Sequence, residues 1–216
     1  MRKGLTLPCE ELETIFRREW TSAGFEDDYQ EQCYLDDGVA QLRAFHASCI
    51  AAPPNVLALE RRFTLELDNG VQVTGRMDQV NEVAEGEVEI VDYKTGKPRT
   101  AAQAQKDLQL SVYAMAARED LELEPVRLVY YNLQTNEVVA ADRDEKSLNQ
   151  VRNAIQEVAA DIRAREFPIK PGFICKSCEY RFLCPSQESQ CGQSLEPEGD
   201  SQRSEWAGDA QVTRGR

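Results

Sequence analysis

The chain has 216 residues, of which 41% are hydrophobic and 29% charged, and a formal net charge of −13. These values are typical of one globular domain with appendages and a sizeable core. No run of 18 apolar residues occurs, and the N-terminus lacks an apolar signal core, so we expect a cytoplasmic protein without a membrane span. Seven cysteines in a chain without an export signal favour metal binding over a disulfide framework.

Hydrophobic periodicity and turn residues predict nine elements in chain order. The predicted helices span residues 8–23, 27–51, 101–119 and 146–166, and the predicted strands span residues 56–67, 71–80, 87–94, 126–133 and 137–141. Asp68-Asn69-Gly70 is a strong hairpin signal between the first two strands. The order helix, three strands, helix, strand predicts an α/β fold with an αβββαβ core.

The predicted organisation has three parts. Residues 1–52 form a helical lead-in, and residues 53–185 form the core with a cysteine cluster at its end. Residues 186–216 are rich in Gln, Ser, Gly and acidic residues, so we expect a disordered acidic tail.

The stretch from Gly75 to Lys97 carries the residues most suited to chemistry. Asp92 and Lys94 are two apart on a predicted strand, so their side chains share one face. If this strand pairs antiparallel with the preceding one, Asp78 lies on that face near Asp92. Two carboxylates and one ammonium suit a bound Mg²⁺ or Mn²⁺ beside an activated water. Taken alone, Asp-x-Lys is more often a solvated strand face with a weak ion pair.

The sequence Gly-Arg-Met-Asp ending at Asp78, followed by Val-Asp-Tyr-Lys-Thr-Gly around Asp92 and Lys94, resembles the core motif of the PD-(D/E)xK nucleases. The likeness is greatest to the RecB-like branch, which occurs at the C-termini of UvrD/AddB-type helicases and in CRISPR adaptation nucleases. The resemblance covers about residues 10–185 and implies a restriction-endonuclease-like fold. It also implies Mg²⁺-dependent hydrolysis of DNA, with Asp78 and Asp92 as metal ligands and Lys94 beside the attacking water.

Gln109 and Tyr113 stand four residues apart in the predicted helix 101–119 and therefore share a face. Leu108, Val112 and Met115 make a separate apolar stripe. Spacing alone favours a Gln and a Tyr at the surface of a partly buried helix. RecB-like nucleases carry a Gln-x-x-x-Tyr element at this place, and the resemblance implies that both side chains line the active site beside DNA.

Cys175, Cys178 and Cys184 form a C-x2-C-x5-C pattern, whose thiolates can converge on one metal centre. Zinc and a four-iron cluster each require four ligands. The RecB-like nucleases with an iron–sulfur staple join three C-terminal cysteines to one far upstream, so the resemblance implies a 4Fe-4S cluster. The alternative is a zinc site that Cys191 completes.

The expected family histidine is missing from its usual position. RecB-like nucleases usually supply a further metal ligand from a histidine on the first core helix, after a glycine. The single histidine of this chain, His46, lies near the end of the predicted helix 27–51 without a glycine at that spacing, so we expect it to be an ordinary helix residue. We infer that the chain begins downstream of the family's histidine and upstream cysteine.

The net charge of −13 disfavours tight binding to free DNA, because phosphates attract Lys and Arg. Lys94, Lys97, Arg99 and Lys106 nevertheless form a local basic group after the motif. The chain has no G-x-x-x-x-G-K-[ST] phosphate loop, so any helicase activity would belong to another chain. We therefore expect a UvrD/AddA-type helicase partner that delivers the DNA.

The sequence thus predicts a metal-dependent deoxyribonuclease of DNA repair or recombination, acting as an exonuclease rather than an endonuclease. One alternative is a catalytically weakened or inactive nuclease fold that binds DNA or a partner. Another is a zinc-stapled structural protein in which the hairpin residues are incidental.

Overall fold

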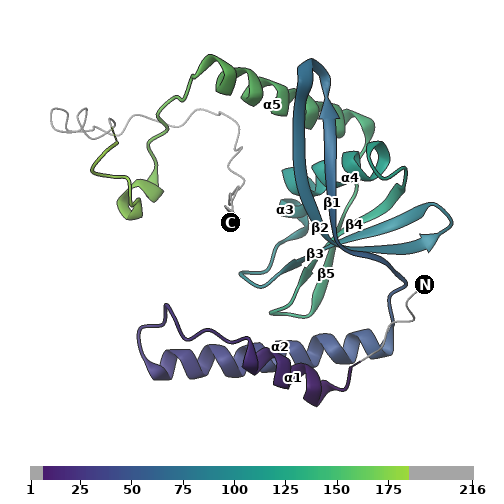
Figure 1. Cartoon of the computed structure of the whole chain (residues 1–216), viewed down its shortest axis with the longest axis vertical. Helices are drawn as coiled ribbons and strands as arrows, with labels where there is room; N and C mark the ends of the chain where they lie inside the picture. The colour runs from purple at the N-terminus through teal and green to yellow at the C-terminus, as the bar shows by residue number, and fades with distance from the viewer. Residues whose placement is uncertain (1–6, 185–216) are drawn as a thin grey trace. The chain divides into compact units, whose positions relative to one another are not determined.

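The computed structural model describes residues 7–184, which form five strands and five α-helices. The chain divides into two compact units, Met1–Asn153 and Ala154–Arg216. The elements are α1 (Cys9–Arg18), α2 (Asp28–Ala51), β1 (Val56–Leu67), β2 (Val71–Ala84), β3 (Glu87–Lys94), α3 (Ala101–Lys106), α4 (Leu108–Glu119), β4 (Glu124–Asn132), β5 (Glu137–Ala141) and α5 (Glu145–Ala164) (Figure 1). Short 3-10 turns occur at Asp68–Gly70 and Phe173–Ser177.

The five strands form one sheet in the order β1-β2-β3-β4-β5. All neighbours are antiparallel except β3 and β4, which run parallel. A parallel pair needs a long crossover, and here α3 and α4 supply it. The predicted fold class is confirmed: α2, β1, β2, β3, the α3–α4 crossover and β4 form a restriction-endonuclease-like αβββαβ core, to which β5 adds an edge strand.

The β1–β2 hairpin shows why local sequence predicted this part of the fold. Its turn has left-handed backbone at Asn69 (φ 61°) and Gly70 (φ 67°), the conformation that favours these residue types in hairpins. Strand β1 has the predicted bounds. Strand β2 continues to Ala84, beyond its predicted end at Val80, and its last residues pair with β3.

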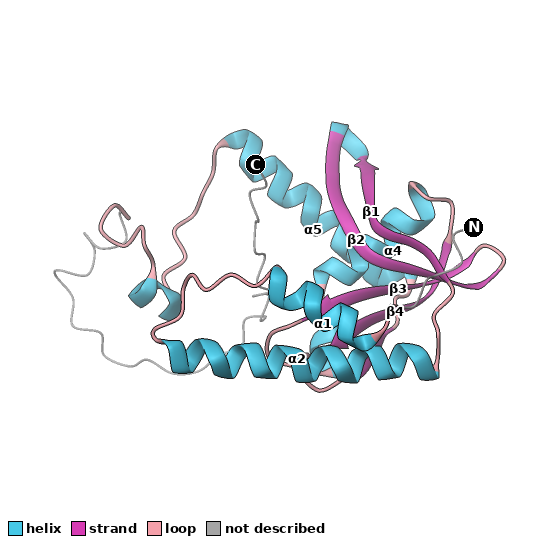
Figure 2. Ribbon diagram, turned by 60° about the horizontal axis from the view of Figure 1, so that its bottom comes forward, coloured by secondary structure: helices cyan, strands magenta, loops and turns pink. Residues whose placement is uncertain are grey.

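Helices lie on both faces of the sheet (Figure 2). The ring of Phe45 in α2 packs edge-on against Tyr93 and Tyr131 at centroid distances of 5.5 and 5.4 Å. On the other face, the Tyr113 hydroxyl of α4 reaches the carboxylate of Asp92. Because neighbouring residues of a strand point to opposite faces, Asp92 faces α4 and Tyr93 faces α2.

The buried face of α4 differs from the predicted apolar stripe. Leu108 is 45% exposed, whereas Leu110 and Met115 are buried. Small residues complete the contact surface of the helix, and these are Ala114, Ala116 and Ala117. They allow the backbone of α4 to approach the sheet, and a pattern based on large apolar residues overlooks them.

The predicted continuous helix 101–119 is interrupted at Asp107, whose backbone is extended (φ −73°, ψ 129°). The Asp107 carboxylate accepts a hydrogen bond from the Gln109 backbone N–H at 2.7 Å and so caps α4. Arg143, in the loop before α5, donates to the carbonyl oxygens of Ala104 at 2.8 Å and Asp107 at 2.9 Å. The break between α3 and α4 is therefore held from both sides, and it fixes where the first turn of α4 starts.

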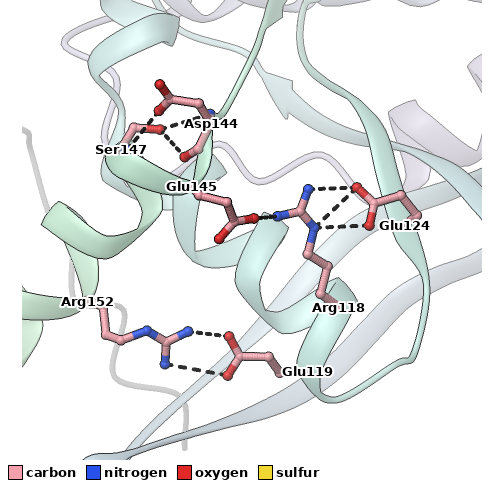
Figure 3. A network of polar contacts seen from close by, with 7 residues as sticks. All are labelled: Arg118, Glu119, Glu124, Asp144, Glu145, Ser147 and Arg152. Atoms are coloured by element: carbon pink, nitrogen blue, oxygen red, sulfur yellow. Dashed lines mark hydrogen bonds and ion pairs between the residues drawn. The ribbon is translucent and has the colours of Figure 1, made fainter.

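A network of charged side chains links the end of α4 to β4 and to the first turns of α5 (Figure 3). Arg118 contacts Glu124 at 2.6 Å and Glu145 at 2.7 Å, and Arg152 pairs with Glu119. The acidic partners are 39–77% exposed, and pairs of this kind contribute only about 0–1 kcal/mol each. The network orients the three elements more than it stabilises the fold.

Hydrophobic periodicity predicts an inward-facing stripe on α5, but only the beginning of the helix is buried in this way. The predicted stripe consists of Leu148, Val151, Ile155, Val158 and Ile162. Leu148 and Val151 are buried, whereas Val158 and Ile162 are 57% and 55% exposed. Ile155 is half-buried, so burial along the predicted stripe decreases toward the end of the helix. No helix within residues 7–184 is long and apolar enough to cross a membrane. The predicted acidic tail lies outside the described residues.

Candidate active site

Asp92 and Lys94 end the strand β3 and share one face of the sheet, as their spacing predicts. The Asp92 side chain is almost fully buried, at 3% exposed. Its Oδ2 lies 2.7 Å from the Lys94 ammonium nitrogen, and its Oδ1 accepts a 3.3 Å hydrogen bond from the Tyr113 hydroxyl. The ammonium and the hydroxyl therefore hold the two carboxylate oxygens from different sides.

Asp78 meets β3 in a way that simple strand pairing did not predict. The β2–β3 ladder ends at the pair Gln79 and Val91, one position before Asp78 would face Asp92. Beyond that point, Asp78 Oδ2 accepts a 2.9 Å hydrogen bond from the Tyr93 backbone N–H. The carboxylate thus takes over the role of a strand carbonyl and lies at the point where the two strands separate.

The strand β1 is distorted beside this point. Glu60 would face Asp78 in the β1–β2 ladder, but neither residue is paired there although Leu59 and Arg61 are. Glu60 has a left-handed backbone (φ 50°), which is uncommon and costly for a residue other than Gly or Asn. Its carboxylate lies 2.7 Å from Arg76 Nε. Strained backbone of this kind is frequent near functional sites.

Helix α4 supplies the two further predicted residues. Gln109 Oε1 accepts a 2.9 Å hydrogen bond from the Lys94 ammonium, and Gln109 Nε2 donates to the Tyr113 hydroxyl at 2.7 Å. The Tyr113 hydroxyl lies 2.9 Å from the Arg76 carbonyl oxygen as well as 3.3 Å from Asp92 Oδ1, and donates toward both. The structure therefore joins Asp92, Lys94, Gln109 and Tyr113 in one closed set of contacts.

Burial dominates the electrostatics of this cluster. Burial raises the pKa of Asp92 above the ordinary value of a carboxyl, although the close ammonium of Lys94 acts in the opposite direction. The negative charge of Asp78 raises the pKa of Asp92 further. Burial and the Asp92 charge also raise the pKa of Tyr113, so its hydroxyl remains a neutral donor. Lys94 therefore only partly compensates the carboxylate charge.

Asp78 and Asp92 fit a hard divalent cation. Carboxylate oxygens are the ligands that Mg²⁺ and Mn²⁺ prefer, and Mg²⁺ usually keeps several waters beside one or two carboxylates. Asp92 Oδ2 is buried and has Lys94 as an ion-pair partner but no hydrogen bond of normal geometry. This oxygen can therefore still take an electropositive ligand. No three His, Cys, Asp or Glu residues are grouped as a metal site anywhere in residues 7–184, so waters or substrate oxygens would complete the coordination.

The geometry agrees with a comparison of the whole chain with known families. A family model of the PD-(D/E)XK nuclease superfamily matches residues 3–185. The chain belongs to the PD-(D/E)XK nuclease superfamily. Members of this superfamily are generally nucleases that use Mg²⁺ or Mn²⁺.

Two further comparisons add little to the family assignment. Among solved structures, a crystal structure of a protein called SSO0001 is similar over 82% of this chain and 94% of that one, with 16% sequence identity and a TM-score of 0.42. No curated protein matches the chain.

The single histidine, His46, contacts the segment before α1. It belongs to α2, whose residue Phe45 packs on the sheet face opposite Asp92. Its Nε2 lies 2.8 Å from the carbonyl oxygen of Leu7. The contact joins α2 to the segment before α1.

The predicted convergence of Cys175, Cys178 and Cys184 is not seen. These three cysteines are described, and they do not form a metal-binding group within residues 7–184. Cys175 Sγ instead accepts a 3.3 Å hydrogen bond from the Gly172 backbone N–H. Thiolate sites rarely form ahead of their metal, because the metal itself offsets the repulsion between the ligands. Cys191 lies outside the described residues.

Two supporting residues gave no motif signal in the sequence. Asn132 is 1% exposed and accepts a 2.9 Å hydrogen bond from the Arg99 backbone N–H. It thereby fixes the loop that follows Lys94 and carries the basic residue Lys97. Arg143 fixes the start of α4, as described above. Both depend on contacts between segments more than 30 residues apart, which spacing cannot reveal.

Proposed function

We propose that this chain is a Mg²⁺- or Mn²⁺-dependent nuclease domain that hydrolyses phosphodiester bonds in DNA. Membership of the PD-(D/E)XK superfamily indicates nuclease-type function. The observation that carries the proposal is the closed set of contacts among Asp92, Lys94, Gln109 and Tyr113, next to Asp78.

Each residue has a role that follows from its contacts. A divalent cation held by Asp78 and Asp92 would polarise the scissile phosphate and lower the pKa of a bound water. Lys94 presents a positive charge and N–H donors at the same place, which stabilises the negative charge that develops on phosphate oxygens. Gln109 orients the Lys94 ammonium, and Tyr113 holds Asp92 Oδ1 through its hydroxyl.

The finer proposal is an exonuclease of the RecB-like branch that acts in DNA repair or recombination. The Gln109–Tyr113 spacing and the C-x2-C-x5-C pattern support the branch. The net charge of −13 supports a UvrD/AddA-type helicase partner that brings the DNA, because the 38 acidic residues outnumber the 25 basic ones and repel free DNA.

The test is cleavage of end-labelled linear DNA and of closed circular DNA by the purified chain with Mg²⁺ or Mn²⁺. We expect shortening of linear DNA from its ends, no cutting of the circle, and no activity in EDTA. Nicking of the circle would instead establish an endonuclease. A folded chain that binds Mg²⁺ but cuts neither DNA would contradict the proposal.

That last outcome would favour the second candidate, a nuclease fold that binds DNA or a partner without cutting. The specific observation behind it is that Asp78 and Asp92 stand without a third acidic or histidine residue grouped with them within residues 7–184. Fluorescence anisotropy with labelled DNA, in parallel with the cleavage assay, distinguishes the two.

We also propose that Cys175, Cys178 and Cys184 bind a metal centre, with a 4Fe-4S cluster as the first choice and zinc as the alternative. Anaerobically purified protein should then show broad visible absorbance together with iron and sulfide. Colourless protein with one equivalent of zinc that is lost in Cys191→Ser would overturn the iron–sulfur choice. Protein that holds neither metal after reconstitution would overturn the site itself.

A further inference from the structure

Lys94 has a third neighbour that neither the motif nor the proposed mechanism uses. Its ammonium nitrogen lies over the ring of Tyr130, 4.9 Å from the ring centroid. Tyr130 belongs to β4 and stands beside Asp92 in the parallel β3–β4 ladder. Its side chain is fully buried. A cation at this distance over an aromatic face is attracted by the ring electrons.

The Tyr130 hydroxyl contributes no comparable contact. It lies near the carboxylate of Asp107, yet within residues 7–184 it is buried without a hydrogen bond of normal geometry. A buried hydroxyl without a partner is a cost to the fold. The feature of Tyr130 that matters to Lys94 is therefore the face of its ring.

The contact between Lys94 and the Tyr130 ring does not involve an oxygen that would bind the divalent cation. Asp92 Oδ2, which lies 2.7 Å from the ammonium, is also the oxygen best placed to take a divalent cation. A cation there would weaken the attraction between Lys94 and Asp92. Gln109 and the Tyr130 ring would still hold the ammonium. Of these two residues, Gln109 belongs to the helix α4 and Tyr130 to the sheet.

We propose that Tyr130 is a positioning residue: the face of its ring keeps the Lys94 ammonium over the end of β3, independently of Asp92. The inference rests on the proposed nuclease function for its kinetic consequence but not for its structural one. Two variants of the full chain separate the contribution of the Tyr130 ring from that of its hydroxyl. Tyr130→Phe keeps the aromatic face, and Tyr130→Met fills similar space with a flexible apolar chain that has none.

The kinetic experiment compares these variants with Mg²⁺ and linear DNA. We expect Tyr130→Phe to keep kcat within about twofold and Tyr130→Met to lower it about tenfold, the effect of a cation–π contact of ordinary strength. KM and the Mg²⁺ dissociation constant should stay unchanged in both variants. An equal loss in Tyr130→Phe and Tyr130→Met, or a kcat of Tyr130→Met equal to the parent's, would overturn the proposal.

The second readout does not need activity. In the NMR spectrum of lysine-labelled protein, the ε-methylene protons of Lys94 should be shifted upfield by the ring current of Tyr130. The shift should persist in Tyr130→Phe and disappear in Tyr130→Met. The matched control is Tyr131→Met, because Tyr131 is the next residue of β4 and packs with Phe45 and Tyr93 on the opposite face. It should leave the Lys94 signal unchanged.

The two measurements distinguish a failure of the proposed nuclease function from a failure of the proposed role of Tyr130. A parent chain without nuclease activity but with the upfield Lys94 signal would contradict the proposed function and support the role of Tyr130. An active parent whose Lys94 protons resonate at ordinary positions would contradict the role of Tyr130 alone. Because this last measurement uses only the parent chain, it stands even if Tyr130→Met does not fold.

Discussion

Asp92→Asn should abolish metal-dependent cleavage, with a loss of at least about a thousandfold in kcat. The amide keeps the shape of the side chain but removes the charge that a divalent cation needs, and metal charge stabilisation contributes several kcal/mol to such reactions. Single-turnover cleavage of labelled DNA measures the rate, and isothermal titration measures Mg²⁺ binding. The matched control is Asp142→Asn, since Asp142 is exposed in the loop after β5 and should keep the parent's rate.

The same substitution should stabilise the metal-free chain at neutral pH. Burial raises the pKa of Asp92, so its charged form is less favourable in the folded chain than in the unfolded one. The parent therefore loses stability as the pH rises through this raised pKa, whereas Asn has no charge to bury. The difference in melting temperature should shrink as the pH falls and Asp92 becomes protonated. A variant that is less stable than the parent at every pH would contradict this account of the site.

Lys94→Met should lower kcat by roughly a hundredfold to a thousandfold while leaving Mg²⁺ binding nearly intact. The loss is that of one preorganised cationic donor at a developing oxyanion. Met is an unbranched side chain one atom shorter than Lys, and it lacks the charge and the N–H groups. Lys97→Met is the matched control, because Lys97 lies in the loop after β3, whereas Lys94 is the lysine that contacts Asp92 and Gln109. Equal losses in the two variants would assign the effect to general electrostatic attraction of DNA.

The sequence predicted the strands better than the helices. The bounds of β1, β3 and β5 match the predicted ranges because alternating apolar residues and the Asp68–Gly70 turn are local signals. The break at Asp107 escaped prediction, since it depends on Arg143 from a distant loop. The exposure of Val158 and Ile162 escaped it too, because periodicity does not say where the core ends.

The features of the candidate site also fall into those that local sequence predicts and those that it does not. Asp92 with Lys94, and Gln109 with Tyr113, are pairs whose shared faces follow from strand and helix geometry, and their mutual contacts agree with the spacing. The contact of Asp78 with the Tyr93 backbone could not be predicted, because it depends on where the β2–β3 ladder stops. The left-handed backbone of Glu60 could not be predicted either, since nothing in a Glu favours it.

Glu60, with its left-handed backbone, also affects the outer edge of the sheet. Strand β1 is an edge strand of 12 residues, and it exposes Leu57 and Leu59. A second molecule could add a strand to such an edge, which is a common start of aggregation. Strand addition needs an unbroken row of backbone N–H and C=O groups. The left-handed backbone of Glu60 interrupts that row, with four residues of β1 before it and seven after it. The distortion beside Asp78 therefore also protects the chain against self-association along β1.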